Sequence, residues 1–325
     1  MNKQLATLLT TLLVSMTSQA GARENITYLL PAPPTLPAFA PWIIAKQKGY
    51  YDTADLNVTF VAARGGVDVA KQIGAGNAVI GGAIGDTPII VRPNGIPVKT
   101  VALLGGGSLT MIAVNKPSGI QAIKDLKGKT MTVVAYSDTT YYALLGSLKK
   151  NGLDQKQVSI QAAGPTGVWQ IFANGQAAAM AGVPDWVVNA QESGQDIELL
   201  PAEQQFKSMP QAILASDETI RNNPEMIHKL VQATLRGMKD VIDDPDDAAQ
   251  TFAAAVPSYQ GKENHLRSVF ELYRTRVYSG QETPGMVDPA HLEAVQDFYL
   301  NEGIITKTSP LSDLYTNQFI TSRHP

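Results

Sequence analysis

Six short segments of the sequence combine small, hydroxyl-bearing, acidic and aromatic residues in the way that non-covalent ligand sites do. They are Thr35 to Phe39, Arg64 to Gly66, Gly85 to Thr87, Ser137 to Tyr141, Pro165 to Gly167 and Pro184 to Trp186. Each follows an expected strand and precedes an expected helix. Free N–H groups at a helix start, together with nearby hydroxyls, can hold the polar or anionic groups of a ligand without covalent chemistry.

The candidate ligand-binding residues come from these six turns. They are Thr35, Phe39, Arg64, Gly65, Asp86, Thr87, Ser137, Thr139, Thr140, Tyr141, Thr166, Asp185 and Trp186. Ser, Thr and Asp cap helices in all proteins, so each turn taken alone has an ordinary structural explanation. Six such turns at the carboxyl ends of strands favour a shared cleft, because open α/β sheets bind their ligands at that edge.

No group of residues has the pattern of a catalytic or metal site. The four histidines, at positions 228, 265, 291 and 324, form no HExxH motif and no i, i+4 pair. The chain has no Cys, which excludes thiol catalysis, disulfides and thiolate metal sites. Ser147 to Lys150 matches the bare SxxK pattern, but the companion SDN and KTG motifs are absent. We therefore expect no enzyme activity, no cofactor and no metal.

Two further segments have structural explanations. Gly105 to Ser108 lacks the spacing and the GK[ST] ending of a phosphate loop, so we expect a tight connection or a close backbone approach there. The acidic run at positions 243, 244, 246 and 247 lacks the alternating ligands, central Gly and distal Glu of a calcium loop. We expect its carboxylates to favour the start of the helix that follows Pro245.

The elements that position these turns alternate between short apolar strands and amphipathic helices, as in α/β proteins. The first expected set contains strands 25–30, 57–62, 79–83, 98–104 and 110–114, with helices 38–48 and 67–75. The second set contains strands 130–135, 158–162, 177–182 and 196–200, with helices from 141, 168–174 and 186–192. After strand 211–215 only helices are expected, at 224–242, 246–255, 264–278 and 289–301. At 325 residues the chain is long enough for about two domains.

The N-terminus has the three parts of a secretory signal peptide. Lys3 gives a positive start, an apolar run extends from Leu5 to Met16, and Ala20 to Ala22 are small residues of the kind that a signal peptidase recognises. We expect cleavage after Ala22. The apolar run is shorter than the roughly 20 residues of a membrane span. Since no cysteine is available for lipidation, we expect an exported, periplasmic protein that does not insert into the membrane.

The charge balance also narrows the class of partner. The chain has 26 Lys and Arg against 29 Asp and Glu, and its formal net charge is −3. The basic residues are scattered along the chain instead of forming a patch. A nucleic-acid partner is therefore not expected, because nucleic-acid binding needs a basic surface.

Several stretches are similar to one family of transport proteins. They are WIIAKQKGYY (42–51), GDTP (85–88), GKTMTVVAYSDTTYYALLGSLKKNG (128–152), VWQIFANG (168–175) and TSR (321–323). They resemble the solute-binding proteins of ABC importers of the taurine, alkanesulfonate and nitrate type, and most closely the taurine-binding periplasmic proteins. The likeness covers nearly the whole chain after residue 22.

This resemblance implies the type II periplasmic binding protein fold, in which two α/β lobes with mixed sheets are joined by two crossover segments and close on a ligand. Residues 23–112 and 213–325 would form a discontinuous lobe I with a helical annex, and residues 113–212 would form lobe II. The implied function is the capture of a small organic solute and its delivery to an ABC permease with its ATPase, by a binding protein that we expect to be a monomer. A ligand-sensing protein that docks on a receptor, or an enzyme on the same fold, is the alternative.

The sequence departs from taurine-binding proteins at two of the turns. Asp86 stands where those proteins carry small hydroxylic residues, and the aromatic-containing turn of lobe II reads Val183 to Trp186. A carboxylate disfavours a sulfonate and favours an amine or a heterocyclic N–H, whereas the hydroxyls of Thr139 and Thr140 suit ligand oxygens. The resemblance implies a sulfonate such as taurine as the ligand, and the two carboxylates keep a related nitrogen-bearing compound, including a pyrimidine precursor, as an open alternative. Capping of its own helix is the alternative role of Asp86.

Overall fold

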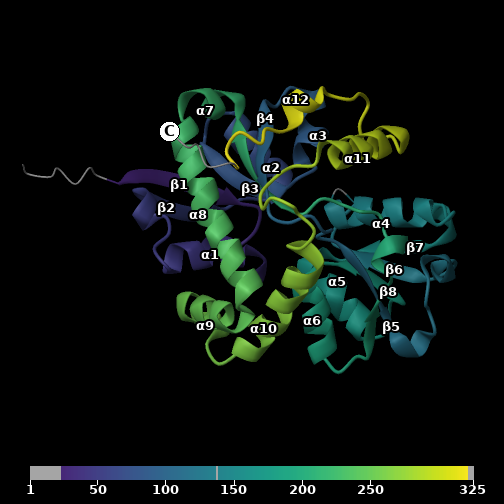
Figure 1. Ribbon diagram of the computed structural model, residues 1–325. Helices are drawn as coiled ribbons and strands as arrows, with labels where there is room; N and C mark the ends of the chain where they lie inside the picture. Colours follow the sequence, from purple (N-terminus) through teal and green to yellow (C-terminus); the bar gives the residue numbers. More distant parts are fainter. Residues whose placement is uncertain (1–22, 137, 321–325) are drawn as a thin grey trace, which may run out of the picture.

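The computed structural model describes residues 23–136 and 138–320, which form two α/β lobes (Figure 1). The strands of the first lobe are β1 (Glu24–Leu30), β2 (Leu56–Ala62), β3 (Ile80–Ile84), β4 (Val98–Leu103) and β10 (Gln211–Ser216). They form one sheet in the order β2-β1-β3-β10-β4. β1 is parallel to β2 and β3, whereas β10 is antiparallel to β3 and β4. The first lobe therefore has a mixed sheet.

The second lobe repeats this arrangement. Its strands are β5 (Met111–Asn115), β6 (Thr130–Val133), β7 (Ser159–Ala162), β8 (Ala179–Gly182) and β9 (Ile197–Leu199). The order is β7-β6-β8-β5-β9, with β6 parallel to β7 and β8, and β5 antiparallel to β8 and β9. The predicted fold class, two α/β lobes with mixed sheets, is confirmed.

The chain passes from one sheet to the other in residues 104–110 and returns in residues 200–210. In each lobe the antiparallel strand, β5 or β10, is the strand that follows a passage. A division of the lobes at 112 and 213 would run through these two strands. We therefore propose lobe boundaries within the two connecting segments. The predicted signal peptide, residues 1–22, lies outside the described residues.

The helices cover the faces of both sheets and continue into a C-terminal annex (Figure 1). They are α1 (Ala40–Gln47), α2 (Gly66–Gly74), α3 (Thr87–Val91), α4 (Thr139–Lys150), α5 (Gly164–Ala173), α6 (Pro184–Glu192), α7 (Asp217–Asn222), α8 (Pro224–Asp243), α9 (Pro245–Ala255), α10 (Glu263–Leu272), α11 (Pro289–Asn301) and α12 (Leu311–Leu314). A π-helical turn, Tyr273–Val277, continues α10. None of the helices in the described part of the chain is both long and apolar enough to cross a membrane.

Each sheet has an apolar core on both faces. In the first lobe, α1, α8 and α9 bury residues such as Trp42, Leu230 and Phe252 on one face, and α2 buries Val69 and Ile73 on the other. α8 packs against α1 so closely that a Cβ on Gly237 would lie 2.0 Å from the Pro41 carbonyl oxygen. Burial of these apolar faces, at about 25 cal/mol per Å², stabilises the layered arrangement.

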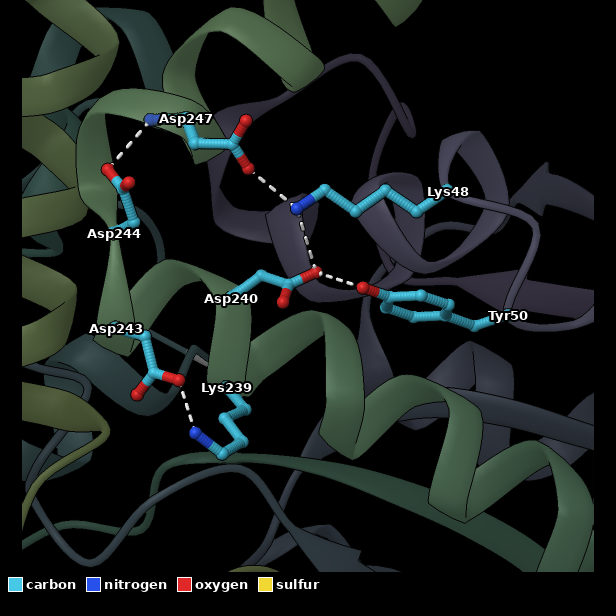
Figure 2. Close-up of polar contacts among 7 residues, drawn as sticks. All are labelled: Lys48, Tyr50, Lys239, Asp240, Asp243, Asp244 and Asp247. Atoms are coloured by element: carbon cyan, nitrogen blue, oxygen red, sulfur yellow. Dashed lines mark hydrogen bonds and ion pairs between the residues drawn. The ribbon is translucent and has the colours of Figure 1, made fainter.

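A polar network links α1, α8 and α9 in the first lobe (Figure 2). Lys48, the residue after α1, places its Nζ 3.2 Å from Asp240 Oδ2 and 2.6 Å from Asp247 Oδ2. Tyr50 donates its hydroxyl to Asp240 at 2.8 Å. Asp244 caps α9, because its side chain accepts two backbone N–H groups of the first turn. The expectation that the acidic run favours a helix start is confirmed.

The first connecting segment is in close backbone contact with the π-helical turn. A Cβ on Gly105 would lie 2.0 Å from the Val277 carbonyl oxygen, and a Cβ on Gly107 would lie 1.9 Å from that of Arg276. The Gly107 N–H donates to the Val277 carbonyl at 3.0 Å. Any side chain at these glycines would separate the two backbones. The predicted close approach at Gly105 to Ser108 is confirmed.

Candidate ligand-binding site

Asp86 lies in the turn between β3 and α3, at the carboxyl end of a central strand. It is fully buried, and its Oδ2 accepts a hydrogen bond from the Tyr299 hydroxyl of α11. Its Oδ1 has no hydrogen-bond partner among the described residues, and its side chain makes no cap bond to α3. Burial raises the pKa of Asp86 from 3.8 to about 6, and the Tyr299 hydroxyl opposes part of this shift. One carboxylate oxygen therefore remains available to a donor.

Asp185 occupies the corresponding position of the second lobe, in the first turn of α6 just after β8. It is 7% exposed, and its Oδ2 accepts the backbone N–H of Ala38, from the first lobe, at 3.2 Å. Its Oδ1 also has no hydrogen-bond partner in the described part of the chain. Burial raises the pKa of Asp185 to about 6, opposed by the Tyr273 hydroxyl and the Ala38 N–H. Each lobe thus contributes one buried, half-satisfied carboxylate.

These two groups differ from every other charged side chain that the structure describes. Within residues 23–136 and 138–320, Asp86 and Asp185 are the only charged side chains that are buried. A buried carboxylate with an unpaired oxygen is costly unless a donor reaches it. No group of His, Asp and Glu in the same residues could hold a metal ion. The arrangement is therefore suited to N–H or ammonium donors.

The two lobes are in direct contact along helices that pack beside these turns. His265 Nδ1 of α10 lies 2.8 Å from Glu192 Oε2 of α6, and Lys149 Nζ of α4 lies 3.5 Å from Glu302 Oε1, just after α11. Figure 1 shows α10 beside α6 and α11 beside α4, so annex helices of the first lobe extend along helices of the second. The turns with Asp86 and Asp185 are enclosed by parts of both lobes.

The start of α4 is built differently from the expectation. Asp138 caps the helix, accepting the Thr140 N–H at 2.9 Å and the Thr140 hydroxyl at 2.7 Å. The hydroxyl hydrogen of Thr140 is therefore used within the cap. Tyr141 donates its hydroxyl to Gln155 at 2.8 Å within the second lobe. Tyr142, its neighbour, packs instead against Tyr299, with ring centroids 5.6 Å apart.

The other candidates occupy several positions. Thr87 is buried, and a Cβ on Gly66 would lie 3.4 Å from its Oγ1, so the turn at Gly65 meets the turn of Asp86. Phe39 is buried in the core beside Trp42. Thr139 and Trp186 are half-buried, whereas Thr35, Arg64 and Thr166 are exposed. Ser137 lies outside the described residues.

Four residues next to the carboxylates were not predicted from the sequence. Tyr299 donates its hydroxyl to Asp86. Tyr142 lies close to Asp86: burial raises the pKa of the Tyr142 hydroxyl most, and the Asp86 carboxyl adds to that rise. Tyr273 and Tyr278 are fully buried near Asp185, which adds to the rise that burial causes in the pKa of both hydroxyls. Three of the four lie in the annex, far from the turns in sequence, and no local pattern distinguishes them from core tyrosines.

The pKa shifts of the two carboxyls predict how asparagine substitution affects ligand-free stability. A carboxyl whose folded-state pKa is raised contributes stability that is present below pH 4 and is lost as the pH rises through about 6. A shift of two units corresponds to about 3 kcal/mol. The free energy of unfolding of Asp86→Asn, relative to that of wild type, should therefore increase by up to about 3 kcal/mol between pH 4 and pH 7.5.

Urea unfolding of the ligand-free protein at several pH values measures this difference. Asp247→Asn is the control, because Asp247 is about half exposed and forms an ion pair with Lys48. A difference between Asp86→Asn and wild type that stays constant with pH would contradict the assignment of Asp86 as a costly buried carboxyl.

Comparison with known proteins finds similarity to a binding protein and to an enzyme. It is 24% identical over 289 residues to the riboflavin-binding protein RibY of Chloroflexus aurantiacus, covering 87% of this chain and 82% of that one. It is 23% identical over 253 residues to the 4-amino-5-hydroxymethyl-2-methylpyrimidine phosphate synthase of Aspergillus parasiticus, covering 72% and 71%.

Among solved structures, the alkanesulfonate-binding protein SsuA of Xanthomonas axonopodis pv. citri bound to MOPS has the same fold. The TM-score is 0.69 at 18% identity, covering 91% of this chain and 98% of that one. The fold is therefore that of the periplasmic binding proteins, as predicted. The sequence pattern of one family, described as NMT1/THI5 like, matches residues 36–248, which is more than half of the chain. The chain therefore belongs to the NMT1/THI5 like family.

Proposed function

We propose that this protein is the substrate-binding component of an ABC importer and that it captures a small organic solute bearing N–H donors between its two lobes. The observation that carries the proposal is the pair of buried carboxylates, Asp86 and Asp185. Each lies at the carboxyl end of a central strand, each comes from a different lobe, and each has one oxygen without a partner among the described residues. The two-lobed fold supports the same role.

The charge of the site favours a nitrogen-bearing ligand over a simple alkanesulfonate. A sulfonate offers only acceptor oxygens and a negative charge, so it would leave both carboxylate oxygens unpaired and repel them. An amine or a heterocyclic N–H would satisfy them with charge-assisted hydrogen bonds. Taurine carries an amine as well as a sulfonate, and therefore belongs among the compounds to be tested. The names of the riboflavin-binding and pyrimidine-synthase relatives support a flat nitrogen heterocycle as the ligand class.

The remaining parts of the proposal follow from the importer role. Residues 1–22 direct export, and the mature protein is periplasmic and monomeric. It delivers the solute to a membrane permease that works with an ATPase. Contacts between the lobes, such as His265 with Glu192, stabilise the closed form that the permease recognises.

A thermal-shift screen of the mature protein, freed of co-purified ligand, tests the proposal. The compounds are taurine, its amine-free analogue ethanesulfonate, MOPS, riboflavin, 4-amino-5-hydroxymethyl-2-methylpyrimidine and uracil derivatives. At a hundredfold excess over Kd, a cognate solute stabilises the protein by about 2.7 kcal/mol. This corresponds to a rise in Tm of roughly 5 to 10 °C. A rise confined to amine-free sulfonates would contradict the proposed ligand class, and no rise with any compound would contradict the binding role.

A further inference from the structure

Four buried polar side chains meet beside the start of α6, and we name them the Asp185 cluster: Asp185, Gln211, Tyr273 and Tyr278. All four are at least nine-tenths buried. Each has an atom without a hydrogen-bond partner among the described residues, namely Asp185 Oδ1, Gln211 Oε1 and the two tyrosine hydroxyls. They come from α6, β10 and the π-helical turn with its following residue, so both lobes contribute.

The members of the cluster are held together by contacts in which these four atoms make no hydrogen bond, although the Tyr273 hydroxyl lies close enough to Asp185 to oppose the rise in its pKa. The peptide of Ala38 links two of them, because its N–H donates to Asp185 Oδ2 at 3.2 Å and its carbonyl accepts the Gln211 Nε2 at 2.6 Å. The rings of Tyr273 and Tyr278 are stacked, with centroids 5.2 Å apart and an interplanar angle of 26°. Packing therefore fixes the side chains, while these four buried atoms make no hydrogen bond with the described residues.

The π-helical turn is what places both tyrosines on the same side. In an α-helix, residues five apart point about 140° away from each other. Here the Tyr278 N–H donates to the Tyr273 carbonyl at 2.8 Å, the i to i+5 bond of a π-helix, so the two residues lie one above the other. The backbone of Gly105 to Gly107 packs directly on this turn. The turn is thus fixed by tertiary contact, as is common where π-helices build functional sites.

The free atoms of the cluster define the chemistry of a partner. Two tyrosine hydroxyls can donate, and two oxygens, from Asp185 and Gln211, can accept. Leaving such groups buried and unpaired is unfavourable, so a bound molecule that matches them gains affinity. A partner with acceptors alone, such as a sulfonate, would satisfy the hydroxyls and leave both oxygens unpaired. The match is an edge on which ring N–H groups alternate with carbonyl oxygens.

An open hollow lies between α6 and the residues that lead into α10. It has a volume of about 620 Å³ and is lined by residues of both lobes, including Leu36, Asn189, Tyr259 and His265. Asp185 lies near enough to Tyr259 to add to the rise that burial causes in the pKa of that hydroxyl. None of the four cluster residues lines this hollow, so it is an entrance between α6 and α10 from which a solute approaches Asp185.

We propose, on the basis of the importer role proposed above, that the Asp185 cluster is the subsite for the imide or ureide edge of a flat nitrogen heterocycle. In this subsite Tyr273 and Tyr278 donate to the ring carbonyls, and Asp185 and Gln211 accept from ring N–H groups. The two tyrosines are specificity-determining residues, because they select ligands whose N–H is flanked by carbonyl oxygen.

Two matched pairs of probes test the subsite by titration calorimetry. Riboflavin is compared with 3-methylriboflavin, and 1-methyluracil with 3-methyluracil; in each pair the second compound lacks the N–H between two carbonyls. The wild-type protein should bind the N–H member of at least one pair roughly 10- to 100-fold more tightly than its methylated partner. Tyr273→Phe and Tyr278→Phe should each weaken binding of that N–H member by a similar factor, since a ligand carbonyl is left unpaired.

The ligand-free proteins provide a second measurement. Tyr51→Phe is the matched control, because Tyr51 is also buried but its hydroxyl is bonded to Thr234 at 2.8 Å. Tyr51→Phe should lower Tm and leave the affinity unchanged, whereas Tyr278→Phe should lower the affinity and leave Tm unchanged or higher. Tyr273→Phe is compared by affinity alone, because its hydroxyl also lies beside Asp185 and opposes the rise in that pKa.

Each contrary result has a defined meaning. If wild type binds an N–H probe and the Phe variants bind it equally well, the tyrosines do not select the ligand and the subsite is wrong. If Tm falls in Tyr278→Phe as it does in Tyr51→Phe, the Tyr278 hydroxyl has a structural partner, and this also overturns the subsite. If wild type binds only amines or aminopyrimidines of the wider screen, the subsite fails while the importer role stands. Failure of every compound to bind overturns the importer role as well.

Discussion

Asp86→Asn and Asp185→Asn should each lower the affinity for a cognate N–H-bearing solute by roughly 10- to 100-fold at pH 7.5. The reason is that each aspartate presents a buried oxygen that has no partner in the described part of the chain. A hydrogen bond to a charged group contributes about 1.5–3 kcal/mol, which corresponds to this range. Asparagine keeps the shape of the side chain but removes the charge. Titration calorimetry with the solute identified in the thermal-shift screen measures the loss.

Two comparisons separate a role in binding from a role in folding. An amine-free analogue of similar shape should lose much less affinity in the two variants than the N–H-bearing solute does. Asp247→Asn, which removes a carboxylate of the network in Figure 2, should leave both affinities unchanged. Equal losses for both ligands would mean that Asp86 and Asp185 only shape the turns and that ligand choice depends on packing.

Gly237→Ala is expected to be the most destabilising single-methyl substitution in the interface between α1 and α8. The added Cβ would lie 2.0 Å from the Pro41 carbonyl oxygen and 3.1 Å from Ala45 Cβ, so the two helices must move apart. Overpacking of this kind costs about 1–3 kcal/mol and sometimes more, and here the clashing atom is backbone. The higher helix propensity of alanine returns only about 1 kcal/mol. We expect a net loss of about 2 kcal/mol or more in the free energy of unfolding, measured by urea denaturation.

Gly167→Ala in α5 is the matched control for this substitution. Its Cβ would lie 3.3 Å from Ala163 Cβ, a methyl group at the start of the helix, and the next atom is 4.0 Å away. Because the contact is only slightly tight and alanine favours the helix, the free energy of unfolding should change by less than about 1 kcal/mol. Equal destabilisation by the two substitutions would show that helix packing at Gly237 is looser than the structure indicates.

The regular elements could be predicted because they follow from local hydrophobic periodicity. The expected strand 25–30 is observed as Glu24–Leu30, and the expected helix 289–301 is observed as Pro289–Asn301. The exceptions are elements that periodicity cannot define. α3 spans only five residues after Asp86, and the expected helix 264–278 changes to a π-helical turn after Leu272. That turn packs on the backbone of Gly105 to Gly107, a contact between distant segments that no local pattern contains.

Within the candidate site, the sequence identified the turns but not their partners. Asp86 and Asp185 follow strands, so their place at the carboxyl ends of the strands could be predicted. Tyr299 lies 213 residues from Asp86, and its hydroxyl reaches that carboxylate only because α11 folds back over the turn. At the start of α4, the sequence suggested a ligand contact for Thr140, whereas the structure uses its hydroxyl in the cap made by Asp138.

By itself, the sequence determined the two sets of α/β units, the helical annex and the turns that carry acidic and hydroxylic residues. These depend on periodicity and on residue types within a few positions of one another. Only the tertiary structure decided which polar atoms remain unsatisfied. Whether Asp86, Asp185 or Tyr273 has a free hydrogen-bonding atom depends on burial and on partners from other segments, and these exist only when both lobes and the annex are packed together.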